Sequence, residues 1–170
     1  LAISSTVSWA RRCVEETGYP DTLIHASATA AIDQQIVHAR EKRVPWGISE
    51  SGFYAFDAAM NYQYHAFGVP GLGFKRGLAE DLVIAPYASM LALSFHTQAV
   101  LQNIEVLQSL QMVGRYGFYE ALDFTPSHLK PGQSHAIVRS YMTHHQGMIM
   151  LAVVNRLQNQ IMAVSYTHLR

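Results

Sequence analysis

The sequence predicts an all-α domain, and three observations support this fold class. Apolar residues recur at helical spacing from Asp21 to Arg43, and the stretch from Ile137 to Asn155 is apolar on two adjacent helical faces. Residues that favour the start of a helix occur at Pro86 and Thr97. No long alternation of apolar and polar residues, the usual sign of a strand, competes with these patterns. We therefore expect helices joined by loops.

The first half of the chain predicts one helix followed by a long connection. Asp21 is placed to cap the helix that runs to Arg43, because a carboxylate can accept hydrogen bonds from the first free N–H groups. Residues 45–77 hold six of the eleven glycines and many aromatic side chains. Glycine density favours a loop, whereas aromatic content opposes disorder. An ordered, functional loop is the expectation here.

The second half predicts further helices. Pro86 suits the first turn of a helix that runs through Leu93, and Thr97 suits the cap of the next helix, which Gly114 would close. Residues 117–126 predict an aromatic connection, after which Thr125 and Pro126 form a cap and a first helical position. The doubly apolar segment from Ile137 to Asn155 predicts a helix that is mostly buried.

Charge and composition exclude several classes of function. Twelve basic residues balance twelve acidic ones, so we expect no nucleic-acid partner and no attraction to an anionic membrane. No stretch approaches the ~18 apolar residues of a membrane-spanning helix. Charged residues make up 14% of the chain, below the typical ~25%. This low fraction indicates apolar surface that a partner would cover.

Cofactor and metal chemistry have little support in the sequence. Cys13 is the only cysteine, which excludes an internal disulfide and a thiolate metal site. His144 and His145 are adjacent, so their side chains point ~100° apart on a helix, and no HExxH spacing accompanies them. The glycine-rich residues 68–77 lack the spacing of a phosphate-binding loop. We expect neither a cofactor nor a metal.

Two clusters combine carboxylates with aromatic rings. Residues 45–64 contain Glu50 and Asp57, and residues 115–123 contain Glu120, Asp123 and several tyrosines. Rings can cover the C–H face of a sugar while carboxylates bind its hydroxyls, and cleavage of a glycosidic bond needs two carboxyl groups. The same residues also fit solvated loop acids and core packing. Composition alone therefore leaves the function open.

Four ordered blocks resemble a known family. These are PWGISES, YQYHAFGVPGLGFKRGLAEDLVIAPYASMLAL, GRYGFYEALDFTP and VRSYMTHHQGMIMLA, and together they cover residues 44–155. They are similar to the glycoamylase-like domain of cyclic β-1,2-glucan synthases, to which endo-β-1,2-glucanases are related. The resemblance implies an (α/α)6 toroid that acts on β-1,2-glucan by hydrolysis or transglycosylation. The alternative is a non-catalytic helical module that binds carbohydrate.

The resemblance also assigns roles to residues. Glu120 matches the proposed general acid, and Glu50 is expected to be the opposing carboxylate, with Asp57 and Asp123 as substitutes. The residues expected to bind substrate are Trp46, Tyr54, Asp57, Tyr62, Tyr116, Tyr119, Asp123, His144 and Gln146.

The chain is shorter than the implied toroid. Twelve helices of ~11 residues with ~5-residue connections need roughly 190 residues before any functional loop, and this chain has room for about six or seven helices. We expect a truncated toroid over residues 1–162, followed by an atypical tail at 163–170. The expected partners are a β-glucan and the remaining helices and domains of a larger, membrane-bound parent on its cytoplasmic side, with no direct membrane contact by this soluble segment.

Overall fold

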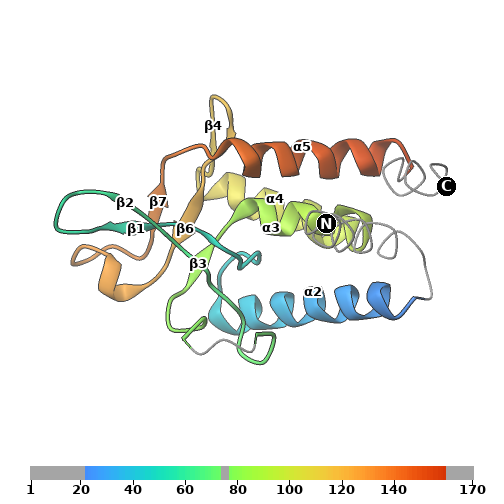
Figure 1. Ribbon diagram of the computed structural model, residues 1–170, viewed down its shortest axis with the longest axis horizontal. Helices are drawn as coiled ribbons and strands as arrows, with labels where there is room; N and C mark the ends of the chain where they lie inside the picture. The colour runs from blue at the N-terminus through green and yellow to red at the C-terminus, as the bar shows by residue number, and fades with distance from the viewer. Residues whose placement is uncertain (1–21, 74–76, 160–170) are drawn as a thin grey trace, which may run out of the picture.

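Helices alternate with short antiparallel strands in the computed structural model, which describes residues 22–73 and 77–159 (Figure 1). Over these residues the helices are α2 (Leu23–Lys42), α3 (Pro86–Met90), α4 (Thr97–Ser109) and α5 (Thr143–Leu157), with 3₁₀-helices η1 (Leu91–Ser94) and η2 (Pro126–His128). The strands are β1 (Ser51–Phe56), β2 (Tyr62–His65), β3 (Val83–Ile84), β4 (Val113–Gly114), β5 (Gly117–Phe118), β6 (Ala121–Asp123) and β7 (Ala136–Val138).

The strands overturn the all-α prediction, and with it the partial (α/α)6 toroid. Strands β3, β6 and β7 form an antiparallel sheet in the order β3-β6-β7, while β1 pairs with β2 and β4 pairs with β5. Most of these strands are two to four residues long, which is too short to show an alternating pattern in the sequence. The described part of the chain is therefore a mixed helical and antiparallel arrangement.

The first predicted helix is confirmed, with a different cap. The hydroxyl of Thr22 accepts a hydrogen bond from the backbone N–H of His25 at 3.1 Å and so starts α2. Arg43 ends α2 in the left-handed conformation, with φ of 58°, and donates its N–H to the carbonyls of Ala39 and Arg40. Asp21, the expected cap, lies outside the described residues.

The starts of α3 and α4 follow the prediction more closely than the end of the chain does. Pro86 begins α3, the helix continues as η1, and α4 begins at Thr97. The expected helix from Ile137 begins six residues later, at Thr143, because Ala136–Val138 forms strand β7 and pairs with β6. Two apolar stripes that run through a strand into a helix mimic one continuous helix in the sequence.

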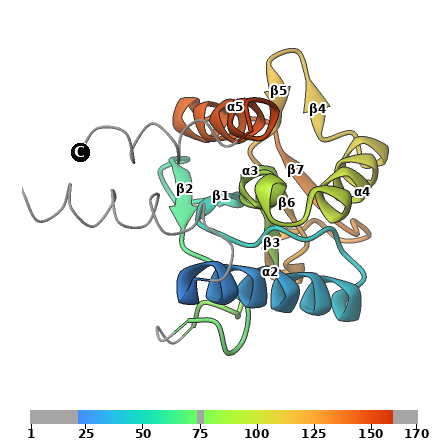
Figure 2. The ribbon, with the colours of Figure 1, turned by 90° about the vertical axis from the view of Figure 1, so that its right-hand side faces the viewer.

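The core forms two clusters of buried apolar side chains. The larger lies around the three-stranded sheet and includes Val83, Ile84, Leu107, Met112 and Leu122, all fully buried. In the smaller, Trp46 packs with residues of α2, α3, η1 and α4, and α5 covers it. In Figures 1 and 2, α5 and α2 lie on opposite sides of α3 and α4. None of the helices in the described residues is long and apolar enough to span a membrane.

Residues 45–77 are not one loop, because they contain the hairpin β1–β2. Asp57 holds its turn by accepting hydrogen bonds from the N–H groups of Ala59 and Asn61, both at 2.9 Å. On its other side β1 meets β6 through side chains: its N–H groups at Gly52 and Tyr54 donate to the carboxylates of Glu120 and Asp123. Two acids that flank and end β6 thus hold the hairpin against the sheet.

Candidate functional site

Glu120 is buried where β1, β6 and α5 meet. Its backbone N–H donates to the carbonyl of Ser140 at 3.0 Å, which ties it to the end of β7. Its side chain is 1% exposed. One carboxylate oxygen, Oε1, accepts from the N–H of Gly52 at 3.1 Å, and the other, Oε2, lies 3.1 Å from Nδ1 of His145. A buried carboxylate is therefore held by an amide and an imidazole.

His145 extends this cluster toward the surface. It lies in the first turn of α5, is 2% exposed, and stacks on the ring of Tyr87 with centroids 3.8 Å apart and planes 16° apart. Its Nε2 lies 3.5 Å from the hydroxyl of Tyr64, a residue that is 39% exposed. The Glu120, His145 and Tyr64 side chains therefore form a connected path from the interior to solvent.

Glu50, the other expected catalytic acid, lies at the exposed edge of the same cluster. Its backbone carbonyl is 3.1 Å from the hydroxyl of Tyr87, which also reaches Oγ of Ser49 at 2.8 Å. Burial raises the pKa of Tyr64 to about 12, and the charges of Glu50 and Glu120 contribute to the increase. Burial also raises the pKa of Tyr87, with both carboxylates adding to it. The structure thus brings Glu50 and Glu120 within electrostatic reach of the same two phenols.

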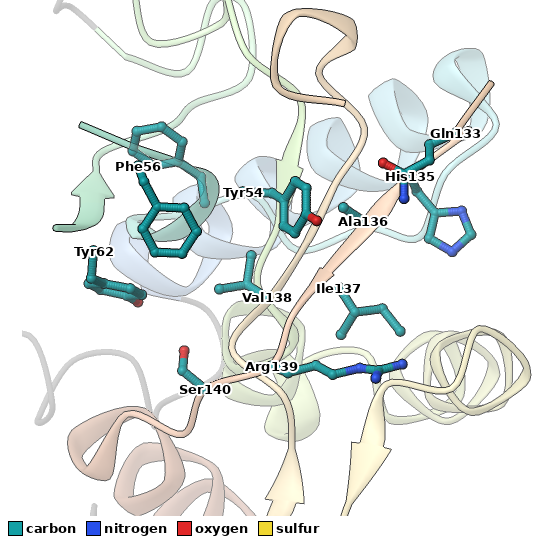
Figure 3. A pocket seen from close by; sticks show the side chains of 11 residues that line it. Tyr54, Phe56, Tyr62, Gln133, His135, Ala136, Ile137, Val138, Arg139 and Ser140 are labelled. Atoms are coloured by element: carbon teal, nitrogen blue, oxygen red, sulfur yellow. The ribbon is translucent and has the colours of Figure 1, made fainter. Parts of the chain in front are cut away.

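Tyr62 lies beside Glu120. Its hydroxyl occupies the space that a side chain at position 52 would fill, so a larger residue there would displace the Tyr62 ring. Burial raises the pKa of the Tyr62 hydroxyl, and the charge of Glu120 raises it further. Tyr62 and Tyr54 also line a cavity of about 550 Å³ between the hairpin β1–β2 and the segment around β7 (Figure 3).

The two expected substitute acids make structural contacts. Asp123 is fully buried and accepts hydrogen bonds from the N–H groups of Tyr54 and Thr125, both at 2.9 Å, while Nδ1 of His128 lies 2.8 Å from its Oδ2. Asp57 is exposed in the β1–β2 turn, where its hydrogen bond from the Asn61 side chain is the main cause that lowers its pKa. Both acids hold the hairpin in place.

The remaining predicted residues lie around other elements. Trp46 is buried in the smaller core cluster, where its backbone N–H and carbonyl bond the side chain of Asn103. Tyr116 and Tyr119 pack against the ring of Tyr141 near hairpin β4–β5. Gln146 donates to the carbonyl of Phe118 at 2.8 Å, and His144 is exposed beside the ring of His145. Their roles in substrate binding stay predictions.

His145 is the residue that sequence reasoning missed. Of the two adjacent histidines, His144 was expected to bind substrate, yet His145 is the one that is buried against Glu120. Because α5 begins at Thr143, His145 points into the interior toward Glu120. The predicted helix began too early, at Ile137. Within the described residues, no group of three or more histidine, cysteine, aspartate or glutamate side chains could hold a metal ion.

Comparison with known proteins gives the class. The profile of a family described as "Putative glucoamylase" matches residues 22–168. Over 133 residues, or 78% of this chain, the sequence is 44% identical to the cyclic beta-(1,2)-glucan synthase NdvB of Rhizobium meliloti (strain 1021), of which it spans 5%. A crystal structure of a putative glucoamylase from Bacteroides caccae shares the fold, with a TM-score of 0.50 and 19% identity over 79% of this chain and 30% of that one.

These findings relate the chain to carbohydrate-active enzymes. More specifically, it belongs to the glycoamylase family, since the family profile covers most of its length. The family resemblance predicted from the four sequence blocks is therefore confirmed. At 19% identity the likeness to the Bacteroides caccae protein concerns the fold alone.

Titration of Tyr64 can test whether the charge of Glu50 acts on the same phenol as that of Glu120. We expect Glu50→Gln to lower the pKa of Tyr64 from about 12 toward the ordinary value near 10, because a negative charge that opposes the phenolate is removed. The change should be seen by NMR of tyrosine labelled with ¹³C at the ring carbon bearing the hydroxyl, titrated through the alkaline range, with Tyr64→Phe to assign the signal. Glu80→Gln, an exposed acid outside the cluster, is the matched control. An unchanged Tyr64 titration would place the Glu50 side chain away from the site.

Proposed function

We propose that this domain acts on a β-1,2-linked glucan by a glycosidase-type reaction, hydrolysis or transglycosylation, with Glu120 as the general acid. The proposal depends on one observation: the Glu120 carboxyl group is held between the N–H of Gly52 and the imidazole of His145. Next to it are Tyr64 and Tyr87, whose pKa values are raised by the charges of both Glu50 and Glu120. The β-1,2 linkage is inferred from the similarity to the glucan synthase of Rhizobium meliloti.

The positions of Glu120 and Glu50 suit the two different roles that carboxyl groups have in such a reaction. One carboxyl group must donate a proton to the leaving oxygen, while a second group on the opposite side of the bond is ionised and acts as a base or nucleophile. Burial and a fixed orientation fit Glu120 to the first role, and exposure at the mouth of the cluster fits Glu50 to the second. Glu50 would act directly or through an intervening water or hydroxyl.

His145 supports Glu120 in this scheme without touching substrate. Its Nδ1 faces the Glu120 carboxylate and its Nε2 faces the hydroxyl of Tyr64, so the imidazole lies between the acid and a group in contact with solvent. A proton that Glu120 gives up can therefore be replaced along the path through His145. The stack of His145 on Tyr87 fixes the plane of the imidazole and keeps Nδ1 directed at the carboxylate.

In this scheme, substrate reaches Glu120 by movement of Tyr62. The Glu120 side chain is 1% exposed, and the Tyr62 hydroxyl lies over Gly52 next to it. Tyr62 is 44% exposed and lies on strand β2, whose only partner strand in the described residues is β1. Rotation of this side chain would uncover the acid when a sugar enters, as a gating residue does in enzymes that close around substrate.

A second candidate function is carbohydrate binding without chemistry. The observation that favours it is the complete burial of Glu120, both of whose oxygens already have partners. In that case Glu120 would only fix β1 to α5, and the exposed rings of the hairpin would bind the sugar. The two candidates predict the same affinity for glucan and differ only in turnover.

The test compares glucan linkages in the full-length protein. Oligosaccharides of glucose joined by β-1,2 bonds are incubated with it, with β-1,3 and α-1,4 oligosaccharides as controls, and products are separated by size. The proposed function predicts shorter or transferred products from the β-1,2 substrate alone. Binding of the β-1,2 oligosaccharide without any product would establish the second candidate, and activity on α-1,4 bonds only would refute the linkage.

A further inference from the structure

We propose that the cavity between the hairpin β1–β2 and the segment around β7 binds a glucosyl unit of the glucan chain, next to the Glu120 site. This inference rests on the proposed function, because it takes a glucan as the ligand. The cavity has a volume of about 550 Å³, within the roughly 300–1,000 Å³ of small-molecule sites. It therefore has room for part of an oligosaccharide.

One side of the cavity is aromatic. Tyr54, Phe56 and Tyr62 contribute their rings from β1 and β2, and Figure 3 shows them gathered on the hairpin side. Phe56 is 57% exposed and Tyr62 is 44% exposed, although exposed rings of this size are unfavourable in water. Flat rings that stay exposed beside a hollow can pack against the C–H face of a sugar.

The other side of the cavity carries polar groups on both sides of the apolar strand β7, whose residues Ala136, Ile137 and Val138 also line it. Gln133 and His135 precede β7, Arg139 and Ser140 follow it, and all four line the cavity (Figure 3). The guanidinium of Arg139 and the amide of Gln133 offer several hydrogen-bond donors for sugar hydroxyls. The Ser140 hydroxyl is buried next to the hydroxyl of Tyr62, with which it interacts. A sugar hydroxyl would replace this partner when Tyr62 rotates.

Two residues connect the cavity to Glu120. Tyr62 lines the cavity, and its hydroxyl lies at Gly52, whose N–H binds the Glu120 carboxylate. Ser140 lines the cavity, and its carbonyl accepts from the N–H of Glu120. A sugar in the cavity would thus be separated from the Glu120 carboxyl group by the Tyr62 side chain. Rotation of Tyr62 would join the cavity and the buried acid into one path for the chain.

The combination of these surfaces points to a carbohydrate. A lipid or an apolar peptide would make no use of the hydrogen-bond donors of Arg139 and Gln133, whereas a phosphate or a polyanion would leave the three rings unused. A neutral sugar ring uses both sides at once. The balanced charge of the whole chain agrees with a neutral ligand.

The test is calorimetric titration of the full-length protein with β-1,2-linked glucose oligosaccharides of increasing length. Phe56→Ala should lower the affinity for the longer oligosaccharides about tenfold, since it removes one stacking ring, while Phe56→Tyr should retain it. Arg139→Ala should also weaken binding, whereas Arg156→Ala, an exposed arginine on α5 outside the cavity, should not. Phe56 and Arg139 are both exposed, so truncation should leave the fold intact, as circular dichroism can verify.

The outcomes separate this inference from the proposed function. Unchanged affinity in both Phe56→Ala and Arg139→Ala, or no binding by the unmodified protein, would overturn the cavity as a sugar site. If β-1,2 turnover is present in the same preparations, the proposed function stands without it. Conversely, weakened binding in the cavity variants together with no turnover by any preparation supports the cavity and removes the catalytic proposal.

Discussion

Glu120→Gln is expected to lower the rate of β-1,2-glucan cleavage or transfer by roughly 10²–10⁴-fold, the usual contribution of a general acid. The reason is chemical, because an amide has no acidic proton to give to the leaving oxygen. The substitution keeps the shape of the side chain. The glutamine carbonyl can still accept from the N–H of Gly52, and its NH₂ group can donate to Nδ1 of His145 when the imidazole proton is on Nε2.

Turnover and glucan affinity must be measured on the same Glu120→Gln protein. We expect affinity to stay within a few-fold of the unmodified value, because the change affects the transition state more than the bound substrate. Glu105→Gln removes one acid from the exposed face of α4 and serves as the control for loss of charge. Full turnover in Glu120→Gln would show that Glu120 is a structural carboxylate and would assign the acid elsewhere.

Some parts of the fold could be predicted from the sequence because their signals are local. Pro86 at the first turn of α3 and the long apolar pattern of α2 each specify an element within one or two turns. Thr125 and Pro126, expected as a cap and first helical position, begin η2. Such features depend on the preferences of neighbouring residues and need no tertiary contact.

The strands could not be predicted, because what defines them is not local. Val83 and Ile84 form a strand only because Leu122 and Asp123 lie opposite them, about forty residues along the chain. Strand β1 is held partly by side chains, with the N–H groups of Gly52 and Tyr54 bound to Glu120 and Asp123. A pattern of alternating residues does not encode such pairing.

In the candidate site, too, local features could be predicted from the sequence and tertiary contacts could not. Glu50 and Glu120 could be selected from short motifs that combine acids with rings, and folding brings them to the same pair of tyrosines. The pairing of Glu120 with His145 could not be foreseen, because it depends on where α5 starts and on a contact across 25 residues. Likewise, Asp123 was expected to bind substrate, and no local pattern indicates that three groups of the protein already bind it.

Asp123→Ala tests that structural role, and we expect it to lower the free energy of unfolding by about 3–5 kcal/mol. Asp123 is fully buried, so its removal leaves the N–H groups of Tyr54 and Thr125 without an acceptor in the interior. His128 also loses its close partner and keeps only Asp81, whose carboxylate is 3.8 Å away. Denaturant unfolding followed by circular dichroism would measure the change.

Comparison with Asp81→Ala shows whether the loss of stability in Asp123→Ala comes from the buried carboxylate itself or from its contact with His128. Asp81 meets the same histidine, but its side chain is 32% exposed and the contact is longer, so its removal should cost about 1 kcal/mol or less. A large loss in both variants would mean that His128 must be paired on both sides. A small loss in Asp123→Ala would mean that water replaces the carboxylate. Strand β1 would then be held against β6 by apolar packing in the larger core cluster, to which Phe53 and Leu122 belong, rather than by the two acids.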